Sequence, residues 1–172
     1  MERKLLEGNV AFVTGASRGI GLAIALELAE QGATVIGTAT TQNGADGITR
    51  QLEEISAPGM GVLMNVNDID QISKALEIAN KQFGDISILV NNAGIQRPCP
   101  PSKDTAPWEE RATEIEINVA GPIHLSTLFI PYFLEKKDQT TLLINVTSGL
   151  AFVPFAAAPV YSATKAAMHS YT

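Results

Sequence analysis

The feature that most constrains the fold is a regular alternation of short apolar runs with longer stretches of helical character. Five runs of six to eight residues are apolar almost throughout, rather than at every second position. Continuous apolar character indicates strands buried on both faces, as in a parallel sheet between two helix layers. The runs are residues 9–15, 33–39, 61–66, 86–92 and 141–148.

Strand–helix alternation at this spacing predicts an α/β fold with a doubly wound parallel sheet, of the Rossmann type. No internal repeat, low-complexity segment or domain boundary is visible, so residues 1–172 are expected to form a single dinucleotide-binding domain. The helices are expected at residues 20–32, 44–56, 68–84 and 107–137, with a last helix beginning near Val160.

Local signals define several helix ends. Asp68 is a plausible N-cap, and Gly32 and Gly84 are plausible stops. Pro122 and Pro131 are expected to kink or interrupt the long helix, because proline has no N–H to donate to the preceding turn.

Composition narrows the functional classes. Hydrophobic residues make up 45% of the chain and charged residues 17%, which favours a compact protein over a disordered one. The net charge of −6 argues against nucleic acid as a partner. The sequence shows no uninterrupted apolar run of about 18 residues and no signal-peptide core, so we expect no membrane span and a cytoplasmic location.

Disulfide and metal sites are not expected. Cys99 is the single cysteine, so it cannot form an internal disulfide or a cysteine-rich metal site. His124 and His169 have no second ligand at metal spacing and are interpreted as packing or surface residues.

Three glycines join the first apolar run to the first helix. Gly15, Gly19 and Gly21 lie in TGASRGIG, between a predicted strand and a predicted helix. Small residues are needed where the backbone turns sharply and approaches a pyrophosphate, and the helix that follows offers free N–H groups to phosphate. This context indicates dinucleotide binding rather than a purely structural turn.

A tyrosine and a lysine lie four residues apart in the last expected helix. One helical turn would place Tyr161 and Lys165 on the same face. An ammonium beside a phenol favours the phenolate, which would make Tyr161 a usable proton donor and acceptor. Taken alone, the pair is more simply interpreted as a solvated helix face.

The glycine spacing, G-x-x-x-G-x-G, resembles that of the short-chain dehydrogenase/reductase family. Further family motifs follow in the same order: NNAG at residues 91–94, Asn118 in EINVAG, Ser148 after the fifth run, and the YxxxK pair. The resemblance implies hydride transfer between a nicotinamide cofactor and a carbonyl or alcohol carbon. It also implies that Tyr161 and Lys165 are catalytic.

The resemblance assigns a role to each site residue. Tyr161 would exchange a proton with the substrate oxygen, and Ser148 would donate a hydrogen bond to that oxygen. Lys165 would act on Tyr161 and hold the nicotinamide ribose, and Asn118 would fix a water that relays protons. The implied cofactor-binding residues are Gly15, Ser17, Arg18, Gly19, Ile20, Gly21, Thr40, Asn65, Val66, Asn91, Ala93, Gly94, Tyr161 and Lys165.

The second apolar run indicates which cofactor is preferred. An acid at its end would bind the ribose 2′-hydroxyl of NAD, but no acid occurs there before Asp46. Arg18 supplies positive charge, and Thr38 and Thr40 supply hydroxyls. We therefore expect NADP(H) to be favoured over NAD(H).

The resemblance differs along the chain. Residues 1–95 look most like bacterial 3-oxoacyl-[acyl-carrier-protein] reductases of fatty acid biosynthesis, whereas residues 96–172 look like another branch of the family. The substrate prediction is therefore a carbonyl compound, either small or bound to acyl carrier protein. A dehydrogenase for another alcohol or ketone, and a cofactor-binding module without turnover, remain as alternatives.

The chain also differs from the family in its length. Members are usually longer, and the chain ends seven residues after Lys165, so the family fold is expected to be incomplete at the C-terminus. By analogy with the family, a homodimer or homotetramer is expected.

Overall fold

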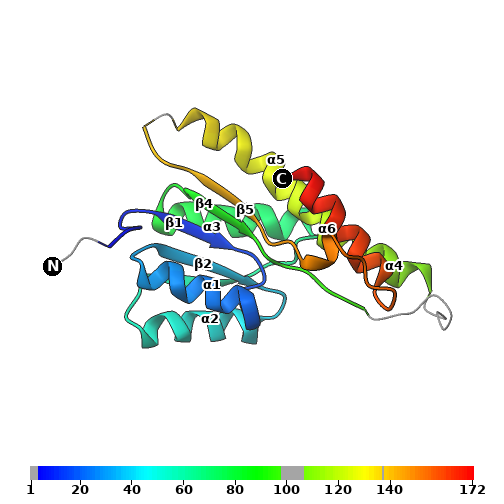
Figure 1. Ribbon diagram of the computed structural model, residues 1–172. Helices are drawn as coiled ribbons and strands as arrows, with labels where there is room; N and C mark the ends of the chain where they lie inside the picture. The colour runs from blue at the N-terminus through cyan, green and yellow to red at the C-terminus, as the bar shows by residue number, and fades with distance from the viewer. Residues whose placement is uncertain (1–3, 98–106, 137) are drawn as a thin grey trace.

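A parallel sheet between helices organises the molecule (Figure 1). The computed structural model describes residues 4–97, 107–136 and 138–172. The strand order is β3-β2-β1-β4-β5, and each neighbouring pair is parallel. The strands are β1 (Val10–Val13), β2 (Thr34–Ala39), β3 (Gly59–Leu63), β4 (Ile88–Asn91) and β5 (Leu142–Asn145). The predicted doubly wound parallel sheet is confirmed.

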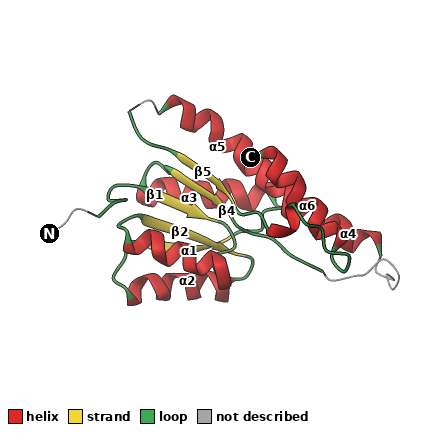
Figure 2. Cartoon of the chain, in the orientation of Figure 1, coloured by secondary structure: helices red, strands yellow, loops and turns green. Residues whose placement is uncertain are grey.

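Helices cover both faces of the sheet (Figures 1 and 2). On one face, α1 (Gly19–Glu30) and α2 (Gln42–Glu54) contribute to a core that includes Ile48, Val35 and Val90. On the other face, α3 (Ile69–Phe83) and α5 (Gly121–Glu135) pack over Phe12, Ile36 and Leu89. Alternate residues of one strand thus serve different cores, which explains why the strands are apolar throughout.

The helix ends follow the local sequence. The Asp68 carboxylate accepts a hydrogen bond from the Gln71 N–H at 3.0 Å and caps α3, as expected. Gly84 ends the same helix with a φ of 81°, and Gly32 follows α1 with a φ of 99°. Both angles lie in the region that glycine adopts without a steric penalty.

The long helical stretch divides into three parts. An α-helix, α4 (Trp108–Ile115), is followed by a π-helical turn, η2 (Glu116–Ala120), and then by α5. Pro122 has no N–H for the carbonyl of Asn118, which accounts for the wider turn immediately before α5. Pro131 lies inside α5 without ending it.

Within Trp108–Glu135, an 18-residue window has a mean hydropathy of 1.3, so by length and composition alone this stretch could cross a membrane. This stretch is interrupted by charged and polar residues, so it is not a continuous apolar run, and the absence of a membrane span remains a prediction. Length and composition do not separate a membrane span from the core helix of a globular domain. In this fold Leu125, Phe129 and Phe133 are buried in the core.

The C-terminal segments complete the described structure. After β5, a short 3₁₀ helix, η3 (Gly149–Ala151), precedes α6 (Pro159–Tyr171). The last helix thus begins close to Val160, as predicted. Cys99 and most of the surrounding proline-rich loop lie outside the described residues.

Candidate functional site

A cavity of about 510 Å³ collects most of the predicted cofactor-binding residues. Its walls come from the carboxyl ends of the parallel strands and from the starts of α1 and α6, which is where ligands bind in open α/β sheets. All the predicted cofactor residues except Asn91 line it. Those in the wall are Gly15, Ser17, Arg18, Gly19, Ile20, Gly21, Thr40, Asn65, Val66, Ala93, Gly94, Tyr161 and Lys165.

The glycine turn leaves no room for larger residues at two of its positions. Gly15 has a φ of 65°, and a Cβ there would lie 2.9 Å from the Cα of Ala93. A Cβ on Gly21 would lie 2.2 Å from the carbonyl oxygen of Gly15. Gly19 also has a positive φ, 57°, but a Cβ there would meet nothing within 4 Å. The turn therefore packs tightly against the NNAG segment while its outer edge stays open.

Two residues that the sequence analysis did not assign hold these segments together. The Thr14 hydroxyl accepts hydrogen bonds from the N–H groups of Asn92 and Ala93, at 3.0 and 2.9 Å. The Asn92 amide in turn donates to the carbonyls of Thr14 and Gly15, at 2.9 and 3.1 Å. The motifs contained a signal for both residues, since Asn92 belongs to NNAG and Thr14 is the first residue of TGASRGIG.

Asn91 lies below the cavity rather than in its wall. Its side chain is 4% exposed, and its amide donates to Asn145 Oδ1 at 2.9 Å and to Ser126 Oγ at 3.2 Å. Asn91 and Asn145 are register partners in β4 and β5. In this structure Asn91 links two strands to α5, and Asn92 occupies the cavity wall instead.

Tyr161 and Lys165 lie on one face of α6, beside the cavity. The Lys165 Nζ lies 5.6 Å from the centre of the Tyr161 ring. Lys165 is 5% exposed, and its Nζ donates to the Val146 carbonyl at 2.8 Å. Burial lowers the pKa of Lys165 from its usual value, because desolvation penalises the ammonium.

Asn118 reaches the cavity through the backbone of Ile95. Its Oδ1 accepts from the Ile95 N–H and its Nδ2 donates to the Ile95 carbonyl, both at 2.8 Å. A Cβ on Gly94 would lie 3.1 Å from Asn118 Oδ1 and 3.6 Å from Lys165 Nζ. Asn118 and Lys165 therefore converge on Gly94, although they come from different helices.

Ser148, like Asn118, is a predicted catalytic residue that is not among the residues lining the cavity. Its hydroxyl accepts from the Leu150 N–H at 3.2 Å and caps η3. Its neighbours Val146 and Thr147 do line the cavity. The Ser148 hydroxyl thus caps η3, although the two residues before it in the sequence line the cavity wall.

The far end of the cavity carries hydroxyl, amide and guanidinium groups. Thr40 is exposed at the end of β2, and Arg18 is exposed at the start of α1. Asp46, the first acid after β2, lies in α2, where it accepts from the Gln42 amide at 2.7 Å. Asp46 is not among the cavity-lining residues.

These features fit a dinucleotide. The glycine backbone is confined where a Cβ would collide, and the start of α1 faces the cavity, as pyrophosphate binding requires. Tyr161 supplies an acid–base group and Lys165 a cationic donor at the opposite end. The arrangement can hold a cofactor and exchange a proton beside it.

The chain belongs to the short chain dehydrogenase family, whose model matches residues 9–172. This agrees with the resemblance inferred from the glycine turn, NNAG and YxxxK motifs.

Several known proteins are similar to it. The chain is 38% identical over 167 residues to an uncharacterized oxidoreductase, DltE, of Bacillus subtilis (97% of the chain, 64% of that protein). It is 42% identical over 145 residues to the 3-oxoacyl-[acyl-carrier-protein] reductase FabG of Escherichia coli (83% and 57%), and 40% identical over 169 residues to that of Vibrio harveyi (97% and 66%). The chain thus spans 57–66% of the length of these relatives.

A solved structure has a similar fold. The apo form of LigO from Sphingobium sp. SYK-6 superposes with a TM-score of 0.89 at 27% sequence identity. The superposition covers 96% of this chain and 61% of the LigO chain.

Proposed function

We propose that the protein is an NADPH-dependent carbonyl reductase. The observation that carries the proposal is the position of Tyr161 and Lys165, on one face of α6 and in the wall of the cavity that begins at the glycine turn. The bound nicotinamide cofactor would supply the hydride. The residues of this chain would bind and orient both reactants and handle the proton.

The proposed roles follow from the contacts of each side chain. Tyr161 donates a proton to the carbonyl oxygen of the substrate. Lys165, fixed by the Val146 carbonyl, binds the nicotinamide ribose and stabilises the phenolate after transfer. Asn118 holds the Ile95 backbone and supports a proton-relaying water, and Ser148 would have to leave its cap on η3 to donate to the substrate oxygen.

A preference for NADP(H) is part of the proposal. It is supported by Thr40 and Arg18 at the far end of the cavity and by the position of Asp46 outside its wall. A Thr40→Asp variant should weaken NADPH binding by about 10-fold through charge repulsion, and the neutral variant Thr40→Asn should not. Fluorescence titrations with NADPH and NADH test this, and equal affinities of the wild type would contradict it.

The proposed substrate is a 3-oxoacyl thioester carried by acyl carrier protein. The support is the similarity to two reductases of that name. Oxidation of NADPH should be followed with acetoacetyl thioesters and with a panel of simple ketones. A Tyr161→Phe variant should lose about 10²–10⁴-fold in rate, since the ring remains but the proton donor is gone.

Other outcomes of this assay would select the alternatives. Turnover of simple ketones but not thioesters would favour a dehydrogenase for another substrate. Cofactor binding without turnover of any carbonyl compound would favour a binding module and contradict the proposed activity.

We also propose a cytoplasmic homodimer or homotetramer. The support is the exposure of three apolar side chains of α5, since Leu128, Ile130 and Leu134 are 43%, 41% and 74% exposed. Light scattering of the purified protein would test this, and a monomer at micromolar concentration would contradict it.

A further inference from the structure

A buried carboxylate, which the mechanism above does not use, lies one helical turn before Asn118. Glu114 is 2% exposed, and its Oε1 accepts from the Arg97 N–H at 3.4 Å. Burial raises the pKa of Glu114. The hydrogen bond from the Arg97 backbone and the charges of Arg97 and Arg111 act in the opposite direction. A buried carboxyl group is costly to keep, so its retention requires a reason.

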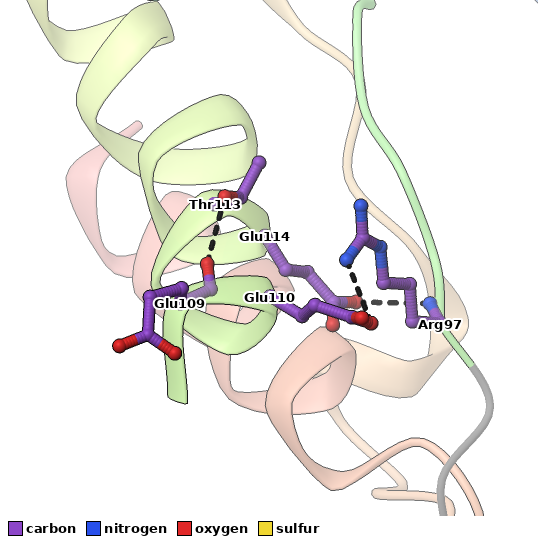
Figure 3. Close-up of polar contacts among 5 residues, drawn as sticks. All are labelled: Arg97, Glu109, Glu110, Thr113 and Glu114. Atoms are coloured by element: carbon purple, nitrogen blue, oxygen red, sulfur yellow. Dashed lines mark hydrogen bonds and ion pairs between the residues drawn. The ribbon is translucent and has the colours of Figure 1, made fainter. Parts of the chain in front are cut away.

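Glu114 belongs to a row of three polar side chains at four-residue spacing. Glu110, Glu114 and Asn118 lie one helical turn apart along α4 and η2. All three contact the segment 95–97: Asn118 holds both backbone groups of Ile95, Glu114 accepts from the Arg97 N–H, and Glu110 accepts from Arg97 Nη1 at 3.0 Å. Figure 3 shows the Glu110 and Glu114 carboxylates turned toward Arg97, and Glu109 turned away.

The segment held in this way forms part of the cavity wall. Gly94, Ile95 and Gln96 line the cavity, and Gly94 packs beside Asn118 and Lys165. Ile95 and Arg97 direct their amides to the helix, and the residue between them, Gln96, lies in the wall. The two fixed amides therefore flank the residue that faces the ligand space.

We propose that Glu114 is a positioning residue for the proposed reductase, fixing the backbone of residues 95–97 so that Gln96 lies beside the Tyr161–Lys165 end of the cavity. The proposal rests on the proposed function. Glu114 acts through the Arg97 amide and touches neither cofactor nor substrate. Its effect should therefore fall on the reaction with the carbonyl substrate and not on cofactor binding through the glycine turn.

Two substitutions separate positioning from stability. Glu114→Leu removes the acceptor but leaves an apolar side chain at a buried site, so the protein should still fold, with urea unfolding measuring the cost of the unpaired Arg97 N–H. Its kcat/KM for an acetoacetyl thioester should fall by about 10-fold, with the NADPH Kd changed by less than about 2-fold. Glu114→Gln keeps an oxygen that can accept from the Arg97 N–H and should restore kcat/KM to within about 3-fold of the wild type.

The matched control is Glu109→Leu on the exposed side of α4, which should leave kcat/KM unchanged. Equal behaviour of Glu114→Leu and Glu109→Leu, or no rescue by Glu114→Gln, would overturn the proposal. So would a rise in the NADPH Kd that parallels the loss of kcat/KM.

Hydrogen exchange makes the test independent of turnover. The Arg97 amide should be protected in the wild type and in Glu114→Gln, and should exchange about 10-fold faster in Glu114→Leu. If the wild type reduces no carbonyl compound, the proposed function fails, but this exchange rate still decides whether Glu114 holds the segment. An unprotected Arg97 amide in the wild type would overturn the positioning role, whether or not Glu114→Leu folds.

Discussion

Two adjacent strands, β4 and β5, both lead into the cavity wall, but they differ in how deeply their side chains are buried. Every residue of β4 is buried, whereas Leu142 and Ile144 of β5 are 43% and 42% exposed at the edge of the described sheet. The glycine turn is bound to the chain that leaves β4, while Lys165 is bound to Val146, just after β5. The glycine-turn end of the cavity therefore lies against the buried core, and the Tyr161–Lys165 end lies against a half-exposed strand.

This difference in burial predicts how substitutions at each end of the cavity affect stability and cofactor binding. Changes near β4 remove close contacts that have no room to relax, so they should affect folding and cofactor binding together. Changes near β5 remove fewer contacts and should leave the fold intact. The predictions below test this contrast, from the largest expected effect to the smallest.

The largest difference in unfolding free energy is expected when a leucine is replaced by alanine in each of the two strands. Leu89→Ala should lower the free energy of unfolding by about 2–5 kcal/mol, because Leu89 is fully buried in β4. Leu142→Ala should cost about 1 kcal/mol or less, because the side chain is already 43% exposed. Urea denaturation measures both, and equal losses would abolish the contrast.

A glycine pair tests the contrast with an added methyl group. Gly21→Ala should destabilise the fold by about 1–3 kcal/mol and weaken NADPH binding, because the new Cβ would lie 2.2 Å from the Gly15 carbonyl oxygen. Gly149→Ala, after β5, should be tolerated, since a Cβ there meets nothing within 4 Å. Neither glycine has a positive φ, so strain does not confuse the comparison. Unchanged stability and NADPH affinity in Gly21→Ala would contradict the packing argument.

Two threonines test the hydrogen bonds. Thr14→Val leaves the amides of Asn92 and Ala93 without their acceptor and should cost about 2 kcal/mol in unfolding free energy. Thr147 lies in the cavity wall near β5, and its hydroxyl has no hydrogen-bond partner among the described residues. The matched variant is Thr147→Val. It should cost about 0.5 kcal/mol. A larger loss for Thr147→Val, by thermal or urea unfolding, would reverse the expected order.

The smallest effect is a pH dependence at the β5 end. Since burial lowers the pKa of Lys165 from its usual 10.5, the unfolded chain binds more protons than the folded chain between those two values. The stability of the wild type relative to Lys165→Met should therefore rise as the pH increases through the folded-state pKa toward 10.5. Urea unfolding of both proteins over this range tests the sign, and a fall would show that Lys165 is not penalised by burial.

The sequence determined the features that depend on neighbouring residues. Continuous apolar runs predicted the parallel sheet. Asp68 and Gly84 predicted the ends of α3, because capping acts within one turn of the helix end. The glycine spacing predicted the turn that begins the cavity. The four-residue spacing of Tyr161 and Lys165 predicted their shared face.

Only the tertiary structure decided which side chains reach the cavity. Asn91 and Asn92 are adjacent in one motif, yet Asn91 is a residue of β4 that bonds to β5 and α5, and Asn92 lies beyond the strand end in the wall. Glu114 resembles its exposed neighbours in the sequence, and only the packing of α4 in the folded chain buries it. Local periodicity sets the direction of a side chain, but the element it meets there depends on segments distant in sequence.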